Sequence, residues 1–205
     1  MSRMNKLIFL GTKVTFLLMM LISIPAIFEA DYILKIWLKE PPEHASVFTM
    51  LIVIGVNINT FYYFIYQAVH ASGKIKKQQI LTTISYLVSV GVIYLSFKMG
   101  ASFYYAAIIP ILFSVVRNII VIISAVETIN FKVKHYFSSV ILPCAGLVLV
   151  LIIIPLALTY FKEASLLRLV MVLTSNTFLL AVLGYFMVLN KEERVILSSL
   201  LQYPK

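Results

Sequence analysis

Cysteine, acidic side chains and glycine are all scarce in this sequence of 205 residues, and each scarcity excludes a class of protein. The single cysteine, Cys144, cannot form a disulfide within the chain, so a disulfide-stabilised fold is excluded. The three histidines are scattered without metal-ligand spacing, and we expect no metal and no cofactor. Gly73 precedes a lysine, but the upstream glycine and following Ser or Thr of a phosphate-binding loop are missing. No nucleophile–base pair is evident, so we expect no enzyme.

Only eight acidic residues are present, against 17 Lys and Arg, and none of the eight lies deep in an apolar stretch. Transporters coupled to protons or sodium usually place a carboxylate inside the membrane. This sequence therefore lacks the usual coupling group. The net charge of +9 raises nucleic acid as a partner. However, no basic stripe interleaved with aromatic residues is present, so we expect no nucleic acid as a partner.

Apolar residues are what the sequence has in abundance, at 61% of the chain, where soluble domains have roughly 45–50%. About 20 apolar residues in an α-helix span the hydrocarbon core of a bilayer, which is about 30 Å thick. The sequence predicts an all-α, polytopic bundle of six transmembrane helices in residues 1–189, with a cytoplasmic amphipathic tail in residues 190–205. The expected spans are Leu7–Phe28, Val47–Tyr66, Ile80–Phe97, Ser102–Val126, Val140–Phe161 and Leu166–Leu189.

Lysine and arginine are unevenly shared between the two sides of the expected bundle. An excess of these residues marks the cytoplasmic side of a membrane protein. We therefore expect both termini in the cytoplasm, and the even number of spans agrees, since it places both termini on one side. The richer side holds Arg3, Lys6, Lys13, Lys74, Lys76, Lys77, Lys132, Lys134, Lys191, Arg194 and Lys205, and the other side holds Lys35, Lys39, Lys98, Lys162 and Arg168.

Two short segments outside the spans have amphipathic patterns. Ile33, Leu34, Trp37 and Leu38 share one helical face and predict a helix lying in the outer interface, ended by Pro41 and Pro42. The tail predicts a second helix, with Asn190 as N-cap, Glu193 at the third position, and an apolar side made by Ile196, Leu200 and Leu201. Lys13, near the start of the first span, is expected to extend its ammonium group to the inner surface.

Arg117 is the charge that most needs a reason, since it lies within the fourth span. A charged side chain at the centre of a span costs on the order of 2.5–3.5 kcal/mol on insertion scales. The arginine shares a small and polar helical face with Ser114, Asn118, Val121 and Ala125. One interpretation is contact with an anionic substrate group, because a guanidinium binds phosphate bidentately. The other is a side chain that reaches the inner headgroups.

A second polar stripe follows the second span, where Asn59, Tyr62, Tyr63, Tyr66 and His70 share a face. Tyrosine rings and amides suit a sugar or a polar lipid headgroup. They equally suit an aromatic belt and a hydrogen bond between helices. The candidate substrate-binding residues are Arg117, Asn118, Asn59, Tyr62 and Tyr63, whereas Asn57 and Asn176 are ambiguous. Pro25, Pro110, Pro143 and Pro155 predict bent helices, as transporters have, although static kinks that aid packing are an alternative.

Several segments, in their order and spacing, resemble those of one family over nearly the whole chain. They are Gly11-Thr-Lys13, Asp31-Tyr-Ile-Leu-Lys-Ile-Trp37-Leu38, Pro42-Glu43, Gln67 to Gln78, and Leu189-Asn-Lys-Glu-Glu-Arg194. In them the chain resembles the C-terminal part of bacterial polysaccharide (O-antigen type) flippases, within the multidrug/oligosaccharidyl-lipid/polysaccharide exporter superfamily. It departs from the family at Lys39, where glycine is frequent, and at Gln78, where an aromatic residue is common.

The resemblance implies an alternating-access transporter of the bacterial inner membrane, built from two pseudo-symmetric lobes. The expected substrate is a lipid-linked glycan, carried on undecaprenyl diphosphate. Because the chain resembles only the last six helices, the expected partners are the bilayer, this substrate and a missing N-terminal lobe of the same protein. Two alternatives stay open: a multidrug/cation antiporter of the same superfamily, and a membrane scaffold or truncated half that transports nothing.

Overall fold

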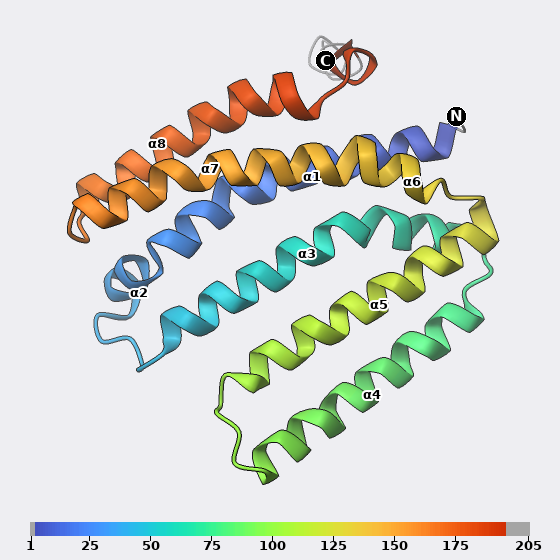
Figure 1. Ribbon diagram of the computed structural model, residues 1–205, viewed down its shortest axis with the longest axis horizontal. Coiled ribbons are helices and arrows are strands. Elements are labelled where there is room, and N and C mark those ends of the chain that lie inside the picture. Colours follow the sequence, from blue (N-terminus) through green and yellow to red (C-terminus); the bar gives the residue numbers. More distant parts are fainter. Residues whose placement is uncertain (1–2, 196–205) are drawn as a thin grey trace.

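The computed structural model describes residues 3–195, and these form helices joined by short loops (Figure 1). Residues 191–195 begin a further helical segment after the last named element. The elements in chain order are α1 (Arg3–Phe28), α2 (Ala30–Leu38), α3 (Ala45–Ala71), α4 (Lys76–Lys98), α5 (Tyr105–Ile129), α6 (Val133–Tyr136), the π-helical turn η1 (Phe137–Ile141), α7 (Leu142–Phe161), α8 (Leu166–Leu183) and the π-helical turn η2 (Gly184–Val188).

Within residues 3–195, six helical segments are long and apolar enough to cross a membrane, which confirms the all-α six-helix bundle. Several helices extend beyond the predicted spans, because a helix can continue past its apolar stretch into the polar interface, where its backbone hydrogen bonds still form. The helix of the second span continues past Tyr66 to Ala71, and that of the third begins at Lys76, before Ile80. The observed segments are Met4–Phe28, Ala45–Ala71, Lys76–Lys98, Tyr105–Ile129, Val133–Phe161 and Leu166–Val188.

The long helices lie side by side (Figure 1). The order begins with α8, continues with α7 and α1 together, and ends with α3, then α5, then α4. Helix α1 packs against α3, α7 and α8, so it joins the two halves of the molecule. Helix α4 lies at the far edge and, among the described residues, packs extensively only against α5. We call the end of the bundle with the N-terminus, the α3–α4 loop and the α5–α6 loop the terminal end. The other end, with α2 and the α4–α5 and α7–α8 loops, is the opposite end.

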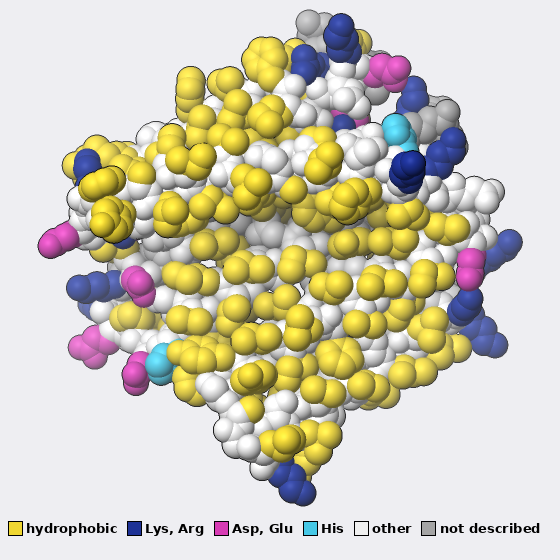
Figure 2. Space-filling view, in the orientation of Figure 1, with side chains coloured by type: hydrophobic (Ala, Val, Ile, Leu, Met, Phe, Trp, Pro, Cys, Tyr) yellow, Lys and Arg dark blue, Asp and Glu magenta, His cyan; other side chains and the backbone are white. Residues whose placement is uncertain are grey.

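Apolar side chains cover the visible face of the bundle, while charged side chains gather at its two ends (Figure 2). Many polar residues are buried inside the bundle beside the apolar ones, because helices in lipid associate through close packing and hydrogen bonds rather than by hiding apolar surface from water. Helix α4 shows this most clearly. Its buried residues are Gln78, Thr82, Ser85 and Ser89, which form one stripe, while leucine and isoleucine side chains face outward.

Close helix contacts depend on glycine at two points along α1. A Cβ on Gly11 would lie 2.8 Å from the ring of Phe64 in α3, and a Cβ on Gly184 would lie 2.9 Å from Leu17 of α1. Between these points the rings of Phe16 and Phe61 pack with centroids 5.0 Å apart. The absence of side chains at the glycines thus allows α3 and the end of α8 to approach α1 closely.

Two buried ion pairs hold α1 to the C-terminal part of the chain. Toward the terminal end, Lys13 donates to both carboxylate oxygens of Glu193, at 3.0 and 2.7 Å. At the opposite end, Glu29 accepts two hydrogen bonds of 2.8 Å from Arg168 of α8. Lys13 and Glu29 are fully buried. The expectation that Lys13 extends to the surface was therefore wrong, because its ammonium group is buried in an ion pair with Glu193.

Both amphipathic segments are helical where the structure describes them, and the first helix ends at Leu38, before the prolines expected to end it. Helix α2 buries Ala30 and Leu34 while Trp37 is 76% exposed, and Lys39 just beyond it has a left-handed backbone. In the tail, the backbone N–H of Asn190 donates to the Glu193 carboxylate at 2.7 Å, which is one half of the predicted capping box. The apolar side expected from Ile196, Leu200 and Leu201 lies outside the described residues.

Candidate substrate cavity between α3, α4 and α5

A cavity of about 310 Å³ lies between α3, α4 and α5, toward the terminal end. All five candidate substrate-binding residues line it, although they come from two helices and are up to 59 positions apart. Tyr63 and Tyr86 are about half exposed (51% and 58%), so the cavity opens on one side of the helix layer. Its lining is Asn59, Tyr62, Tyr63, Tyr66, Gln78, Gln79, Thr82, Tyr86, Arg117, Asn118 and Val121.

Arg117 places its guanidinium group on the cavity wall. The group lies over the ring of Tyr86, 4.0 Å from the ring centroid, in a cation–π contact across α4 and α5. Its Nη2 donates to the carbonyl oxygen of Pro110 at 3.4 Å, which lies seven residues toward the N-terminus of α5. Its Nη1 is buried and has no hydrogen-bond partner. The guanidinium is therefore directed away from the terminal end, and one of its donors is free to bind a ligand.

Two amides connect the walls of the cavity. The side chain of Asn118 in α5 donates to the Asn59 side chain of α3, with 3.3 Å between nitrogen and oxygen. Asn118 is buried because the neighbouring turns of α5 pack against α3, the contact on which Gly55 also lies. This bond holds α3 and α5 in register beside the guanidinium, and it leaves further amide hydrogen-bonding capacity toward the cavity.

Gln78 lines the cavity but was not among the candidate residues predicted from the sequence. Its side chain is fully buried, yet neither its amide nitrogen nor its amide oxygen has a partner. An unpaired buried polar group costs about 1–3 kcal/mol, so its persistence here needs a reason. The polar stripe of α4 was visible in the sequence at helical spacing. The spacing alone does not distinguish it from the polar residues common in transmembrane helices, because the burial of Gln78 depends on how α4 packs.

A second cavity, of about 380 Å³, continues from the first toward the opposite end. Asn59 and Arg117 belong to both linings, so the guanidinium lies where the two cavities meet. The second lining is largely apolar, with Phe48, Ile52, Val56 and Ile111 among its residues. Together the two cavities present amides, hydroxyls and a cation next to an apolar surface, an arrangement suited to an amphiphilic anion.

Other polar residues of the spans serve packing instead. Asn57 donates to Ser23 of α1 at 2.7 Å, and Asn176 donates to the carbonyl oxygens of Met20 and Leu21. His70, at the end of the tyrosine stripe, stacks on Tyr66 with ring centroids 4.0 Å apart and does not line the cavity. Among residues 3–195 no group of three metal-ligating side chains is found.

Comparison with known proteins finds no match for this chain: no family model, no curated protein and no solved structure matches it.

Proposed function

We propose that this chain is the C-terminal portion of a flippase that moves undecaprenyl-diphosphate-linked polysaccharide units across the bacterial inner membrane by alternating access. In this proposal both termini are cytoplasmic, and an N-terminal lobe completes the transporter. The proposal rests on the resemblance described above and on the chemistry of the cavity. Six helices within residues 3–195 that are long and apolar enough to span a bilayer support a multi-pass membrane protein.

The observation that carries the proposal is Arg117, a cation on an apolar helix with one buried, unpartnered donor at the junction of two cavities. A diphosphate offers oxygens that a guanidinium binds through charge-assisted hydrogen bonds. The amides of Asn59, Asn118 and Gln78 and the tyrosine hydroxyls suit the hydroxyl groups of sugars. The apolar second cavity suits the hydrocarbon carrier, so each part of a lipid-linked glycan has a complementary surface.

The buried carboxylates favour the flippase over the cation antiporter. Glu29 and Glu193 are both held by basic side chains at 2.7–2.8 Å, and neither lines the cavities around Arg117. An antiporter needs a carboxylate that binds and releases its coupling ion. The paired glutamates therefore serve as structural contacts in this proposal.

Ligand binding tests the role of Arg117 directly. The purified chain is titrated with undecaprenyl diphosphate and, in parallel, with uncharged undecaprenol. Loss of a hydrogen bond to a charged group corresponds to about 10- to 100-fold weaker binding, so Arg117→Ala should weaken diphosphate binding by that factor and leave undecaprenol binding unchanged. Lys98→Ala, which removes an exposed cation from the other end of α4, is the matched control and should change neither.

The corresponding test in cells introduces Arg117→Ala into the chromosomal gene. We expect loss of surface polysaccharide at an unchanged level of the protein in the membrane. Normal surface polysaccharide, or equal weakening of diphosphate and undecaprenol binding, would contradict the proposal. Drug efflux that depends on a proton gradient and survives this substitution would favour the antiporter instead.

A further inference from the structure

A separate and larger cavity, of about 760 Å³, lies at the terminal end, away from Arg117. Three parts of the chain enclose it: the first turns of α1, the α6–η1 segment, and residues 190–193. They are distant in sequence but are brought together by the Lys13–Glu193 ion pair and the capping bond at Asn190. Its lining is Lys6, Leu7, Phe9, Leu10, His135, Ser139, Asn190, Lys191, Glu192 and Glu193.

The charges around this cavity do not cancel. Glu193 is paired with Lys13 at 2.7 Å, and Glu192 is paired with Lys6 at 2.8 Å. The hydrogen bond from Lys6 and its positive charge lower the pKa of the Glu192 carboxyl. Lys191 and the neighbouring Lys132 and Lys134 have no ion pair within the described part of the chain. The cavity and its margin therefore carry a surplus of positive charge.

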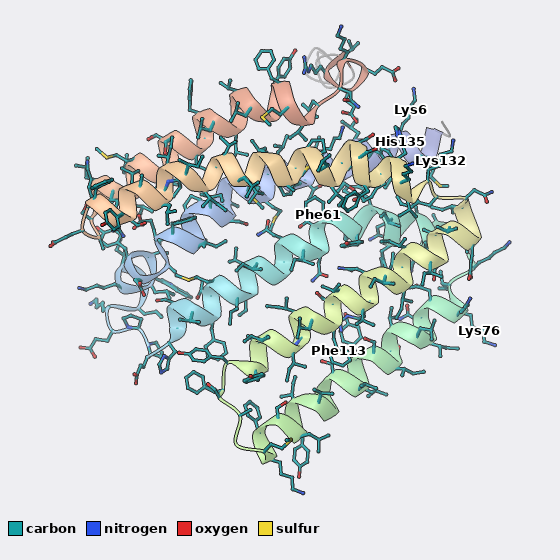
Figure 3. All side chains as sticks on the ribbon, in the orientation of Figure 1. Lys6, Phe61, Lys76, Phe113, Lys132 and His135 are labelled. Atoms are coloured by element: carbon teal, nitrogen blue, oxygen red, sulfur yellow. The ribbon has the colours of Figure 1, made fainter. Side chains whose placement is uncertain are left out.

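Apolar side chains lie directly beside these cations. Leu7 is 62% exposed, and Leu10 and Phe9 continue the apolar wall, where the Phe9 ring lies 5.5 Å from the His135 ring. The labelled side chains Lys6, Lys132 and His135 lie close together at this end, whereas Lys76 lies farther along the same end on α4 (Figure 3). The helical segments have 23 to 29 residues, more than the about 20 that cross the hydrocarbon core, so their ends reach the headgroup region when they span a bilayer.

We propose that this cavity is a binding site for an anionic phospholipid, with the phosphate near Lys191, Lys132 and Lys134 and the acyl chains along Leu7 and Leu10. Basic pockets between transmembrane helices bind anionic lipid headgroups in this way. The site is independent of the proposed flippase function, since no residue lines both this cavity and the one around Arg117. Bound lipid would bridge α1, the α6–η1 segment and the C-terminal tail.

Native mass spectrometry of the purified, delipidated chain tests the site. Defined phosphatidylglycerol and phosphatidylcholine are added back, and the bound fraction is measured for each. A lysine near a membrane surface contributes about 1 kcal/mol to anionic lipid binding, which is about fivefold in affinity. We expect phosphatidylglycerol to bind preferentially, and Lys134→Gln/Lys191→Gln to weaken it by about 25-fold without changing phosphatidylcholine binding.

Lys191 lines the cavity, and Lys134 lines an adjoining cavity that shares His135 with it. The matched control is Lys74→Gln/Lys76→Gln, which removes the same charge from the same end but from residues that line neither cavity. All four lysines are exposed, so both variants are expected to fold, and equal melting temperatures would confirm it. Excess inorganic phosphate should not displace the lipid, because the apolar wall contributes to binding. Equal binding of the two lipids, equal losses in both double variants, or displacement by free phosphate would each overturn the proposal.

Discussion

Lys13 and Arg117 are both basic residues within apolar helices, and their partners give them different roles. Lys13 is fully buried against a carboxylate at 2.7 Å, so its charge is already neutralised inside the protein. Arg117 contacts a ring and a carbonyl oxygen, and among the described residues no carboxylate pairs with it. A buried charge is costly unless it is paired. The unneutralised arginine is therefore the one available to an anionic ligand.

At the same scale, Gln78→Met should stabilise the protein while weakening the proposed ligand binding. Methionine has nearly the volume of glutamine, and it removes two buried polar atoms that have no partner. We expect about 1 kcal/mol of stabilisation, measured as a higher melting temperature in detergent. Gln79→Met, at an exposed lining position, is the control and should change the melting temperature less. A lower melting temperature for Gln78→Met would mean that the amide supports the fold.

Arg168→Met should be strongly destabilising, because it leaves the carboxylate of Glu29 buried without its bidentate partner. Breaking one side of a buried pair costs about 3–5 kcal/mol, whereas replacing both partners with apolar residues is often neutral. The double variant Glu29→Leu/Arg168→Met should thus recover most of the loss in a denaturation series.

The control for the Arg168 variants is Lys77→Met, which breaks the exposed Lys77–Glu127 pair of the same 2.8 Å length. An exposed pair contributes about 0–1 kcal/mol, so its loss should be hardly measurable. Similar losses from Arg168→Met and Lys77→Met would show that burial does not decide the strength of these pairs.

At the scale of elements, helix α1 is positioned by close contacts that only a glycine allows. Gly11→Ala would bring a Cβ to 2.8 Å from the Phe64 ring, so α1 and α3 must separate or the ring must move. Overpacking of this kind costs about 1–3 kcal/mol, which exceeds the gain in helix propensity. We expect a lower melting temperature for Gly11→Ala.

Gly146→Ala provides the matched control in α7, because a Cβ there has no neighbour within 4 Å. This substitution should raise stability by up to about 1 kcal/mol through helix propensity alone. The two alanine variants should therefore change the melting temperature in opposite directions. A higher melting temperature for both variants would show that the contact between α1 and α3 accommodates the added methyl group.

The elements also show how far the sequence could predict the structure. The six spans were predictable because span length and hydropathy are local properties of the chain, and the five candidate residues followed from helical spacing on two helices. The partner of Lys13 could not be predicted, because Glu193 lies 180 positions away and no local pattern relates the two residues. Gln78 was missed for a similar reason: its burial and its lack of a partner depend on where α4 packs, not on its neighbours in sequence.

At the scale of the whole molecule, the proposed orientation can be tested with cysteine accessibility. The native Cys144 is fully buried and should not react with a membrane-impermeant maleimide. Glu43→Cys, exposed at the opposite end, should react in intact cells, whereas Lys76→Cys at the terminal end should react only after permeabilisation. The reverse pattern would mean that both termini face outward.

The position of α4 has a consequence for synthesis in the membrane. Its polar stripe of Gln78, Thr82, Ser85 and Ser89 lies on the side toward the bundle, and α5 is the one helix against which it packs extensively among the described residues. During translation α4 leaves the ribosome before α5 does. Until α5 follows, the α4 stripe lacks the helix that covers most of it in the finished bundle. We therefore expect α4 to reach its final packing only after α5 has been inserted beside it.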